Sequence, residues 1–196
     1  MKKNYLFVCL IFFSVLFSAA HAQTQFELEG VVVPRTIEFQ GNKLLLNGFG
    51  IRTKLFMDVY VQALYLSKLT DNPEEIMESD TEMAIRIQVT SSLVTSKKLT
   101  KSLNKGMTNS VGEEELKKYQ KQMDMLISLL GKEDTKNDDA FNLIYNSNDK
   151  SIWIYKNDRL EGKIPGFDFK KVFFGNWLSN KPVDEKLKQN LLGKFE

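Results

Sequence analysis

Residues 55–67, which read LFMDVYVQALYLS, are the most strand-like segment of the chain, because β-branched and aromatic side chains dominate them. Every odd position from Met57 to Tyr65 is apolar or aromatic, whereas Asp58 and Gln62 interrupt the even positions. Successive side chains of a strand point to opposite faces of the sheet. The segment therefore predicts a strand with one deeply buried face and one less buried face.

Further strand patterns lie on both sides of this segment. Pro34 ends the first of them, Gln40-Gly41-Asn42 fits a hairpin turn between the second and third, and Asn/Asp/Lys turns separate the last three. The additional strands are expected at Phe26–Val33, Thr36–Phe39, Lys43–Asn47, Met83–Val89, Ala140–Tyr145, Ile152–Tyr155 and Leu160–Ile164.

In the segments between these strands, apolar residues recur every three or four positions, which predicts helices. The helices are expected from Asn72-Pro73 to about Ser79, from Thr95 or Ser96 through Leu103, at Glu113–Leu130, at Phe167–Leu178 and after Pro182. Strands followed by helices, a strand meander and helices again predict an α+β fold, a mostly antiparallel β-sheet backed by a layer of helices. No linker composition divides it, so one domain is expected over residues 23–196.

The first 22 residues have the pattern of a secretory signal peptide. Lys2 and Lys3 precede a short apolar run, Leu6–Phe17, and Ala20-His21-Ala22 supplies the small-x-small cleavage pattern. The run is too short for a membrane-spanning helix, which needs about 20 apolar residues. We therefore expect residues 1–22 to be removed and the remainder to be exported, periplasmic or secreted from a bacterium, with no membrane span left.

The only Cys and the only His of the chain, Cys9 and His21, both lie in this segment. The mature chain could therefore form no disulfide, no Cys-His or Ser-His-Asp catalytic site and no zinc site built on those residues. Removal of two lysines from 27 basic residues leaves 25, against 25 acidic residues. A chain without net charge lacks the basic excess that nucleic acid or an anionic membrane surface attracts.

Two short motifs are rejected as cofactor or metal sites. Gly48-Phe49-Gly50 lacks the third glycine of a dinucleotide fingerprint and is followed by a strand rather than a helix. The acidic residues Asp134, Asp138 and Asp139 lack the glycine and the terminal glutamate of a calcium loop. Neither a cofactor nor a metal is expected.

Arg52 is the leading functional candidate. It is one of only four arginines, and it stands between an apolar, glycine-containing run and the strand-like segment. A guanidinium close to a core needs a partner carboxylate or a bound anion. The pattern leaves both interpretations open, an internal ion pair, for instance with Asp58, or an anion site.

Two blocks of sequence resemble the chalcone isomerase-like family. The first is Leu46-Asn47-Gly48-Phe49-Gly50-Ile51-Arg52-Thr53-Lys54 followed by Val59–Leu66. The second is Ile164–Phe169 followed by Trp177-Leu178, Pro182-Val183-Asp184 and Leu187–Gly193, which resembles the closing helices of the bacterial branch of the family. The resemblance runs from about Leu44 to Gly193. It implies an open-faced sandwich in which an antiparallel sheet and a helical layer enclose a ligand cleft.

The resemblance also implies what Arg52 does. In plant chalcone isomerases the matching arginine stabilises a phenolate during an intramolecular Michael addition, and in plastid relatives without that activity it binds fatty-acid carboxylates. The threonine of the isomerase site falls at Tyr60, and its tyrosine and asparagine fall near Thr95 and Ser102. Because the groups that polarise the enone are replaced, flavanone formation is not expected, and no catalytic residue is assigned.

The leading hypothesis is therefore a non-catalytic binder of a small amphiphilic or aromatic anion such as a fatty acid. Arg52 and Tyr60 are too far apart along a straight strand to meet, but a hairpin turning at Thr53-Lys54 would bring them to one anion. The ligand-binding residues would be Arg52, Tyr60, Thr95 and Ser102. One alternative is an intramolecular lyase or isomerase of an enone-like substrate, and another is a structural or interaction role in which Arg52 is simply ion-paired.

Overall fold

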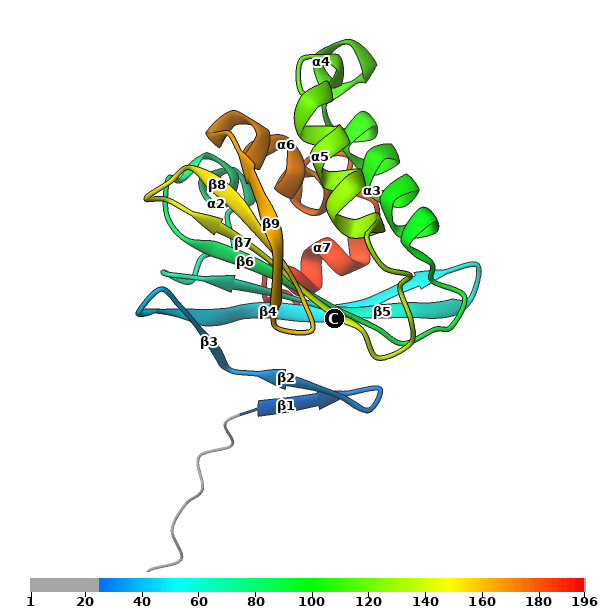
Figure 1. Cartoon of the computed structure of the whole chain (residues 1–196). Coiled ribbons are helices and arrows are strands. Elements are labelled where there is room, and N and C mark those ends of the chain that lie inside the picture. Colours follow the sequence, from blue (N-terminus) through cyan, green and yellow to red (C-terminus); the bar gives the residue numbers. More distant parts are fainter. Residues whose placement is uncertain (1–24, 196) are drawn as a thin grey trace, which may run out of the picture.

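A curled, seven-stranded antiparallel sheet forms the centre of the protein. The computed structural model describes residues 25–195, so the expected signal peptide, residues 1–22, lies outside the described residues. The strands follow one another in chain order across the sheet, as Figure 1 shows. They are β3 Thr36–Phe39, β4 Asn42–Lys54, β5 Met57–Leu66, β6 Met83–Val89, β7 Ala140–Asn146, β8 Ser151–Lys156 and β9 Arg159–Pro165.

Helices cover one face of this sheet (Figure 1). They are α2 Pro73–Glu78, α3 Ser96–Val111, α4 Glu113–Lys117, α5 Gln120–Gly131, α6 Phe167–Leu178 and α7 Glu185–Leu191. The predicted fold class, an antiparallel sheet backed by a helical layer, is confirmed. Within residues 25–195, no helix combines the length and the apolar character that crossing a membrane requires.

The opposite face of the sheet is covered by a two-stranded ribbon, β1 Gln25–Leu28 and β2 Val31–Pro34. The prediction of one strand over Phe26–Val33 is wrong, because Glu29 and Gly30 turn the chain back with φ of 50° and 73°. Val31 and Val33 point from the ribbon into a second, smaller core, which includes Val61, Ala63 and Tyr65 of β5.

Both faces of β5 are buried, which differs from the prediction of one deeply buried face. Tyr60, Leu64 and Leu66 pack in the core under the helices, with Gln62 fully buried on the same face, while Val61, Ala63 and Tyr65 pack toward the β1–β2 ribbon. The polar side chain of Gln62 therefore does not show that the even-numbered face of β5 is exposed to solvent. Only the first residues of the strand, next to the hairpin turn, are exposed.

The helix predicted over Glu113–Leu130 is divided into α4 and α5. The amide groups of Lys118 and Tyr119 bond to carbonyls three residues back, so the α-helical ladder tightens into a 3₁₀-like turn and then restarts. The break places the Tyr119 ring 5.9 Å from that of Phe169, centroid to centroid. The other predicted helices and strands are confirmed to within a few residues at their ends, with two exceptions. The strand β4 extends from Asn42 to Lys54, and the helix α3 continues beyond Leu103 to Val111.

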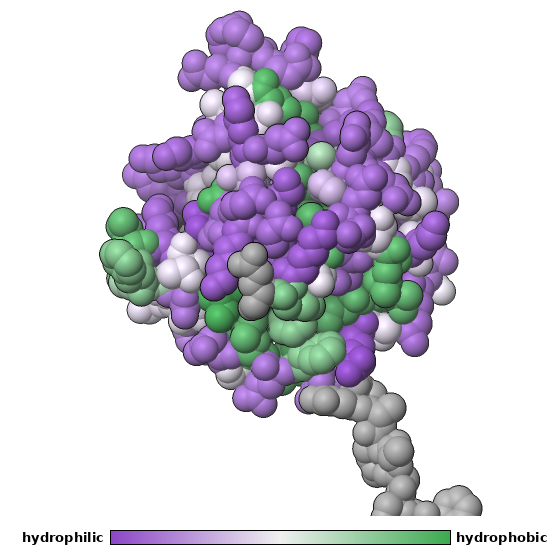
Figure 2. Space-filling view, turned by 180° about the vertical axis from the view of Figure 1, so that it is seen from behind, coloured by the Kyte–Doolittle hydropathy of each residue, from purple (hydrophilic) through white to green (hydrophobic). Residues whose placement is uncertain are grey.

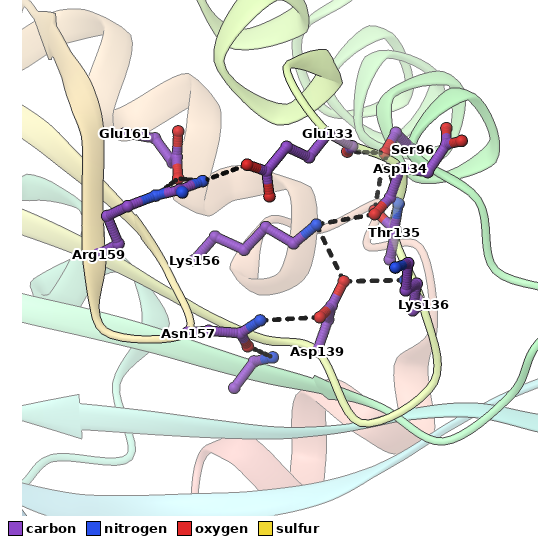
Figure 3. A network of polar contacts seen from close by, with 11 residues as sticks. Ser96, Glu133, Asp134, Thr135, Lys136, Asp139, Lys156, Asn157, Arg159 and Glu161 are labelled. Atoms are coloured by element: carbon purple, nitrogen blue, oxygen red, sulfur yellow. Dashed lines mark hydrogen bonds and ion pairs between the residues drawn. The ribbon is translucent and has the colours of Figure 1, made fainter.

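A buried polar network fixes the start of α3 (Figure 3). The Ser96 hydroxyl donates to the carbonyl of Glu133 at 2.9 Å and accepts from the amide of Thr135 at 2.9 Å. The same loop is tied to β8, because Lys156 forms a 2.9 Å ion pair with Asp139. These contacts join three segments that are distant in sequence, and they set the position of the helix that forms one wall of the site described below.

Candidate functional site

The β4–β5 hairpin brings Arg52 and Tyr60 together. They are directly paired in the register of the two strands, and side chains directly opposite one another in an antiparallel pair have Cβ atoms about 5 Å apart. The turn residues are Leu55 and Phe56, two positions beyond the predicted turn at Thr53-Lys54. A hairpin therefore brings Arg52 and Tyr60 to adjacent positions, with the turn in a different place, and their convergence on one anion stays a prediction.

Arg52 is ion-paired with Asp184, not with Asp58. Its Nη1 donates to Asp184 Oδ2 and to the carbonyl of Thr53, both at 2.7 Å. The two charged side chains are each 17% exposed. The suggested partner Asp58 is paired with Thr53 in the strand register, and its carboxylate accepts the Thr53 hydroxyl instead. Of the two interpretations of Arg52, the internal ion pair is therefore present, and its partner, Asp184, lies near the other end of the chain.

Asp184 is held in place by helix α7. Its Oδ1 accepts from the amide of Leu187 at 3.0 Å, so the same carboxylate caps α7 and pairs with Arg52. Gly48 and Gly50 explain why α7 can lie on β4, since a Cβ at Gly48 would stand 2.1 Å from the carbonyl oxygen of Asn190. The two glycines that fail as a cofactor motif thus serve close packing. A capping aspartate before Glu185 was the sequence signal for Asp184, but it does not reveal the arginine.

Tyr60 is buried, and its phenol is neutral at ordinary pH. Burial raises the pKa of Tyr60; the neighbouring Trp177 and Arg52 lower it and Asp184 raises it, with burial prevailing. A neutral phenol can donate a hydrogen bond to an anion. Tyr60 is therefore a buried donor beside a guanidinium.

Polar atoms without partners surround Tyr60. The indole N–H of Trp177 and both amide atoms of Gln62 are buried and find no hydrogen-bond partner of good geometry among the described residues. Gln62 lies two residues from Tyr60 on the same face of β5. Since a buried unpaired polar group costs about 1–3 kcal/mol, such groups near one another indicate a place where a polar ligand atom or water is accommodated.

An apolar cleft of about 280 Å³ lies between the end of the β4–β5 hairpin and α3. It is lined by Lys54, Leu55, Met57, Val59, Tyr60, Leu93, Val94, Lys98, Leu99 and Ser102. Seven of these ten residues offer apolar or aromatic surface, and the two lysines and Ser102 supply the polar groups. This composition suits an amphiphilic molecule, whose tail needs apolar walls and whose head needs a few polar contacts.

The four predicted site residues are thus only partly together. Tyr60 and Ser102 line the cleft from opposite walls, whereas Arg52 is next to Tyr60 but outside the lining. Thr95 caps α3 by accepting from the amide of Lys98 at 3.3 Å, and it is also outside the lining. Sequence reasoning missed Lys54 at the end of β4, Leu93 in the loop before α3 and Lys98 in the first turn of α3, all of which line the cleft.

Metal binding has no support within residues 25–195, where no group of three or more His, Cys, Asp or Glu side chains is arranged to hold an ion. The acidic residue Asp139 is occupied by Lys156, the amide of Lys136 and Asn157. The polar groups that line the cleft are the ammonium groups of Lys54 and Lys98 and the hydroxyls of Tyr60 and Ser102.

The class of the protein is an α+β fold with a curled antiparallel sheet and helices on one face. Its longest hairpin carries an arginine–tyrosine pair. Comparison with family sequence models identifies the family, since the model described as chalcone isomerase-like matches residues 25–193. The chain belongs to the chalcone isomerase-like family.

Similar solved structures include that of a fatty-acid binding protein of Arabidopsis thaliana. The two chains are 15% identical and superpose with a TM-score of 0.69, over 86% of this chain and 95% of the other. At this identity the likeness concerns the fold. A search among curated proteins returns no significant match.

Proposed function

We propose that this protein is a non-catalytic binder of a small amphiphilic anion such as a fatty acid. The observation that carries the proposal is the apolar cleft that ends at Tyr60, a buried neutral phenol next to Arg52. An apolar wall that leads to a donor and a cation is complementary to a hydrocarbon tail with a carboxylate. The fatty-acid binding function of a protein with the same fold agrees with this proposal.

In this proposal the head group accepts a hydrogen bond from Tyr60 and pairs with Arg52. Among the described residues the guanidinium's hydrogen bonds to Asp184 and to the carbonyl of Thr53 both use Nη1, so Nη2 and Nε can face an anion beside Tyr60. Asp184 then has two effects, because it orients Arg52 beside Tyr60 and also neutralises part of its charge. The unpaired N–H of Trp177 offers a further donor next to Tyr60. Ser102 contacts the tail side of the ligand, and Thr95 acts through the position of α3.

The size of the cleft favours a short or medium hydrocarbon tail. Its volume of about 280 Å³ is at the small end of the roughly 300–1,000 Å³ that drug-sized ligands occupy. We also propose that the protein acts outside the bacterial cytoplasm, as a member of an exported branch of the family. The signal-peptide pattern of residues 1–22 supports this location.

Isothermal titration calorimetry with octanoate, laurate and palmitate tests the binding proposal. Ser102→Leu places a larger side chain inside the cleft and should reduce affinity about tenfold or more, as steric loss of a buried tail segment implies. Asn109→Leu is the matched control, an exposed position on the same helix outside the cleft. Equal affinity of both variants, or no heat with any of the three acids, would reject the proposal.

A further inference from the structure

The turn of the β4–β5 hairpin consists of two apolar residues in a conformation that they normally avoid. Leu55 and Phe56 have φ of 50° and 65°. Leu55 is 78% exposed and Phe56 is fully exposed. A two-residue hairpin turn with both φ values positive favours Asn-Gly, Asp-Gly or similar residues, whereas bulky residues there are strained outliers.

The other two-residue hairpins within the described chain use the expected residues. The β1–β2 turn is Glu29-Gly30 and the β3–β4 turn is Gln40-Gly41. The β8–β9 turn, Asn157-Asp158, has φ of 49° and 64°, almost the same backbone as Leu55-Phe56. The same fold thus builds this turn with polar residues or glycine elsewhere. Leu and Phe are not required to close the hairpin, and strain retained in an exposed turn indicates a function.

More apolar surface adjoins the turn. Met57 and Leu93 are also exposed, and both line the cleft together with Leu55. Figure 2 shows an apolar group that projects from the edge of the molecule where the β4–β5 hairpin ends. We call Leu55, Phe56, Met57 and Leu93 the apolar tip.

Positive charge flanks the apolar tip. Lys54 precedes the turn and Lys98 shares the cleft lining with Leu55, while Lys97 and Lys101 are exposed on the first two turns of α3. The nearby carboxylate of Asp58 accepts a hydrogen bond from Thr53. The charges of the chain are nearly balanced overall, but lysines are concentrated at this end of the molecule, which can therefore attract an anionic membrane surface.

We propose that the apolar tip docks on an anionic phospholipid bilayer. Leu55 and Phe56 insert among the acyl chains near the head groups, and the four lysines contact the phosphates. A second protein copy is a poorer occupant, because a stable interface involves about 20–30 residues on each partner, whereas the apolar tip has four residues. A narrow projecting tip matches a soft lipid surface better than a rigid protein face.

This docking would place the mouth of the cleft at the lipid surface, because Leu55, Met57 and Leu93 belong to both. A lipid-derived ligand could then pass between bilayer and cleft without crossing water. The docking itself goes beyond the proposed function, since it requires only the tip and its lysines.

The test is sedimentation of the protein, beginning at Gln23, with vesicles of phosphatidylglycerol and phosphatidylcholine or of phosphatidylcholine alone. The protein should sediment with the anionic vesicles, and added salt should weaken the association. Phe56→Gly should lower the association about tenfold or more, while raising the midpoint of thermal unfolding, because glycine relieves the positive φ. Leu69→Ser, an exposed leucine beyond the opposite end of β5, is the matched control and should sediment like the wild type.

Lys97→Glu with Lys101→Glu tests the charges, since neither residue lines the cleft, and it should abolish association with the anionic vesicles. Phe56→Gly that sediments like the wild type would overturn the proposal, as would wild-type protein that remains in the supernatant. A concentration-dependent dimer that forms without lipid and is lost in Phe56→Gly would assign the tip to self-association instead. Calorimetry with laurate is read separately, so failure of docking and failure of ligand binding remain distinguishable.

Discussion

Arg52 and Asp184 lie 132 positions apart in the sequence, and their side chains form an ion pair of 2.7 Å. The pair joins the hairpin that carries Tyr60 to the first residue before α7. One carboxylate thus caps a helix, orients a guanidinium and competes with any anion that approaches it.

Neutralising this competitor should strengthen ligand binding. Asp184→Asn keeps a good helix cap, because asparagine is as effective as aspartate at this position, but removes the negative charge beside Arg52. We expect affinity for laurate to rise by about tenfold, the effect of roughly 1.4 kcal/mol. Isothermal titration calorimetry measures this affinity. Arg52→Met combined with Asp184→Asn leaves neither charge and should bind more weakly than the wild type; unchanged affinity in both variants would mean that Arg52 is purely structural.

Replacement of Gly48 should displace α7 from its packing position on β4 and destabilise the protein. In Gly48→Ala the new Cβ would meet the backbone of Asn190 and Leu191 at 2.1–2.7 Å, and backbone cannot move aside as a flexible side chain can. We expect a loss of unfolding free energy of about 2 kcal/mol or more, measured by urea denaturation. Gly131→Ala is the control, because a Cβ there meets nothing within 4 Å and the residue ends α5. That variant should be as stable as the wild type or more stable.

The buried ion pair of Asp139 and Lys156 should appear in acid unfolding. Burial alone would raise the pKa of Asp139, but Asn157, the amide of Lys136 and Lys156 outweigh it, and the pKa lies below its ordinary value. Its contribution to stability is therefore complete above the unfolded pKa of about 4 and is lost as the pH falls through the folded pKa. Asp139→Asn should cost about 3 kcal/mol at pH 7, and the difference from wild type should shrink below pH 4 in chemical denaturation.

Lys170 should give a dependence of the same sign in alkaline solution, because its pKa is also lowered in the folded protein. It is fully buried and donates to the carbonyls of Ile76, Met77 and Ser79, and burial lowers its pKa from 10.5 to about 8. Between these two pH values the unfolded chain holds the proton that the folded chain has released, so this residue makes stability rise with pH.

Lys170→Met removes that rise and leaves three carbonyls without their donor. We expect it to be about 2 kcal/mol less stable at pH 7 and to fall further behind the wild type between pH 8 and 10.5. Denaturation at several pH values compares the two proteins. A constant difference across this range would show that the ammonium keeps its proton, held by the three carbonyl groups.

Local sequence patterns predicted most of the fold, because most elements here follow their own periodicity and caps. Phe167–Leu178 is an example, since its helix has the expected ends. Patterns were insufficient where a turn used unusual residues. Leu55 and Phe56 extend an apolar run and carry no turn signal, so the hairpin was placed two residues early.

The sequence could predict only those site residues that lie close to one another along the chain. Arg52 and Tyr60 share one hairpin, and their pairing follows from a turn between them. Asp184, Trp177 and Lys98 reach the same region from other elements, and no spacing rule along the chain connects them to β4. The sequence could therefore offer only the nearby Asp58 as an example of a partner for Arg52, and the Asp58 carboxylate accepts the Thr53 hydroxyl instead.

The β1–β2 ribbon has a consequence for folding. It covers part of the second core, and a two-stranded ribbon is marginal by itself, so it should be the last part to dock and the first to detach. The Tyr65 hydroxyl donates to the carbonyl of Pro34 at 2.9 Å and thereby holds the end of β2 on the sheet. Each detachment uncovers Val61, Ala63 and the other apolar side chains of the second core, so the β1–β2 ribbon protects the folded protein against aggregation.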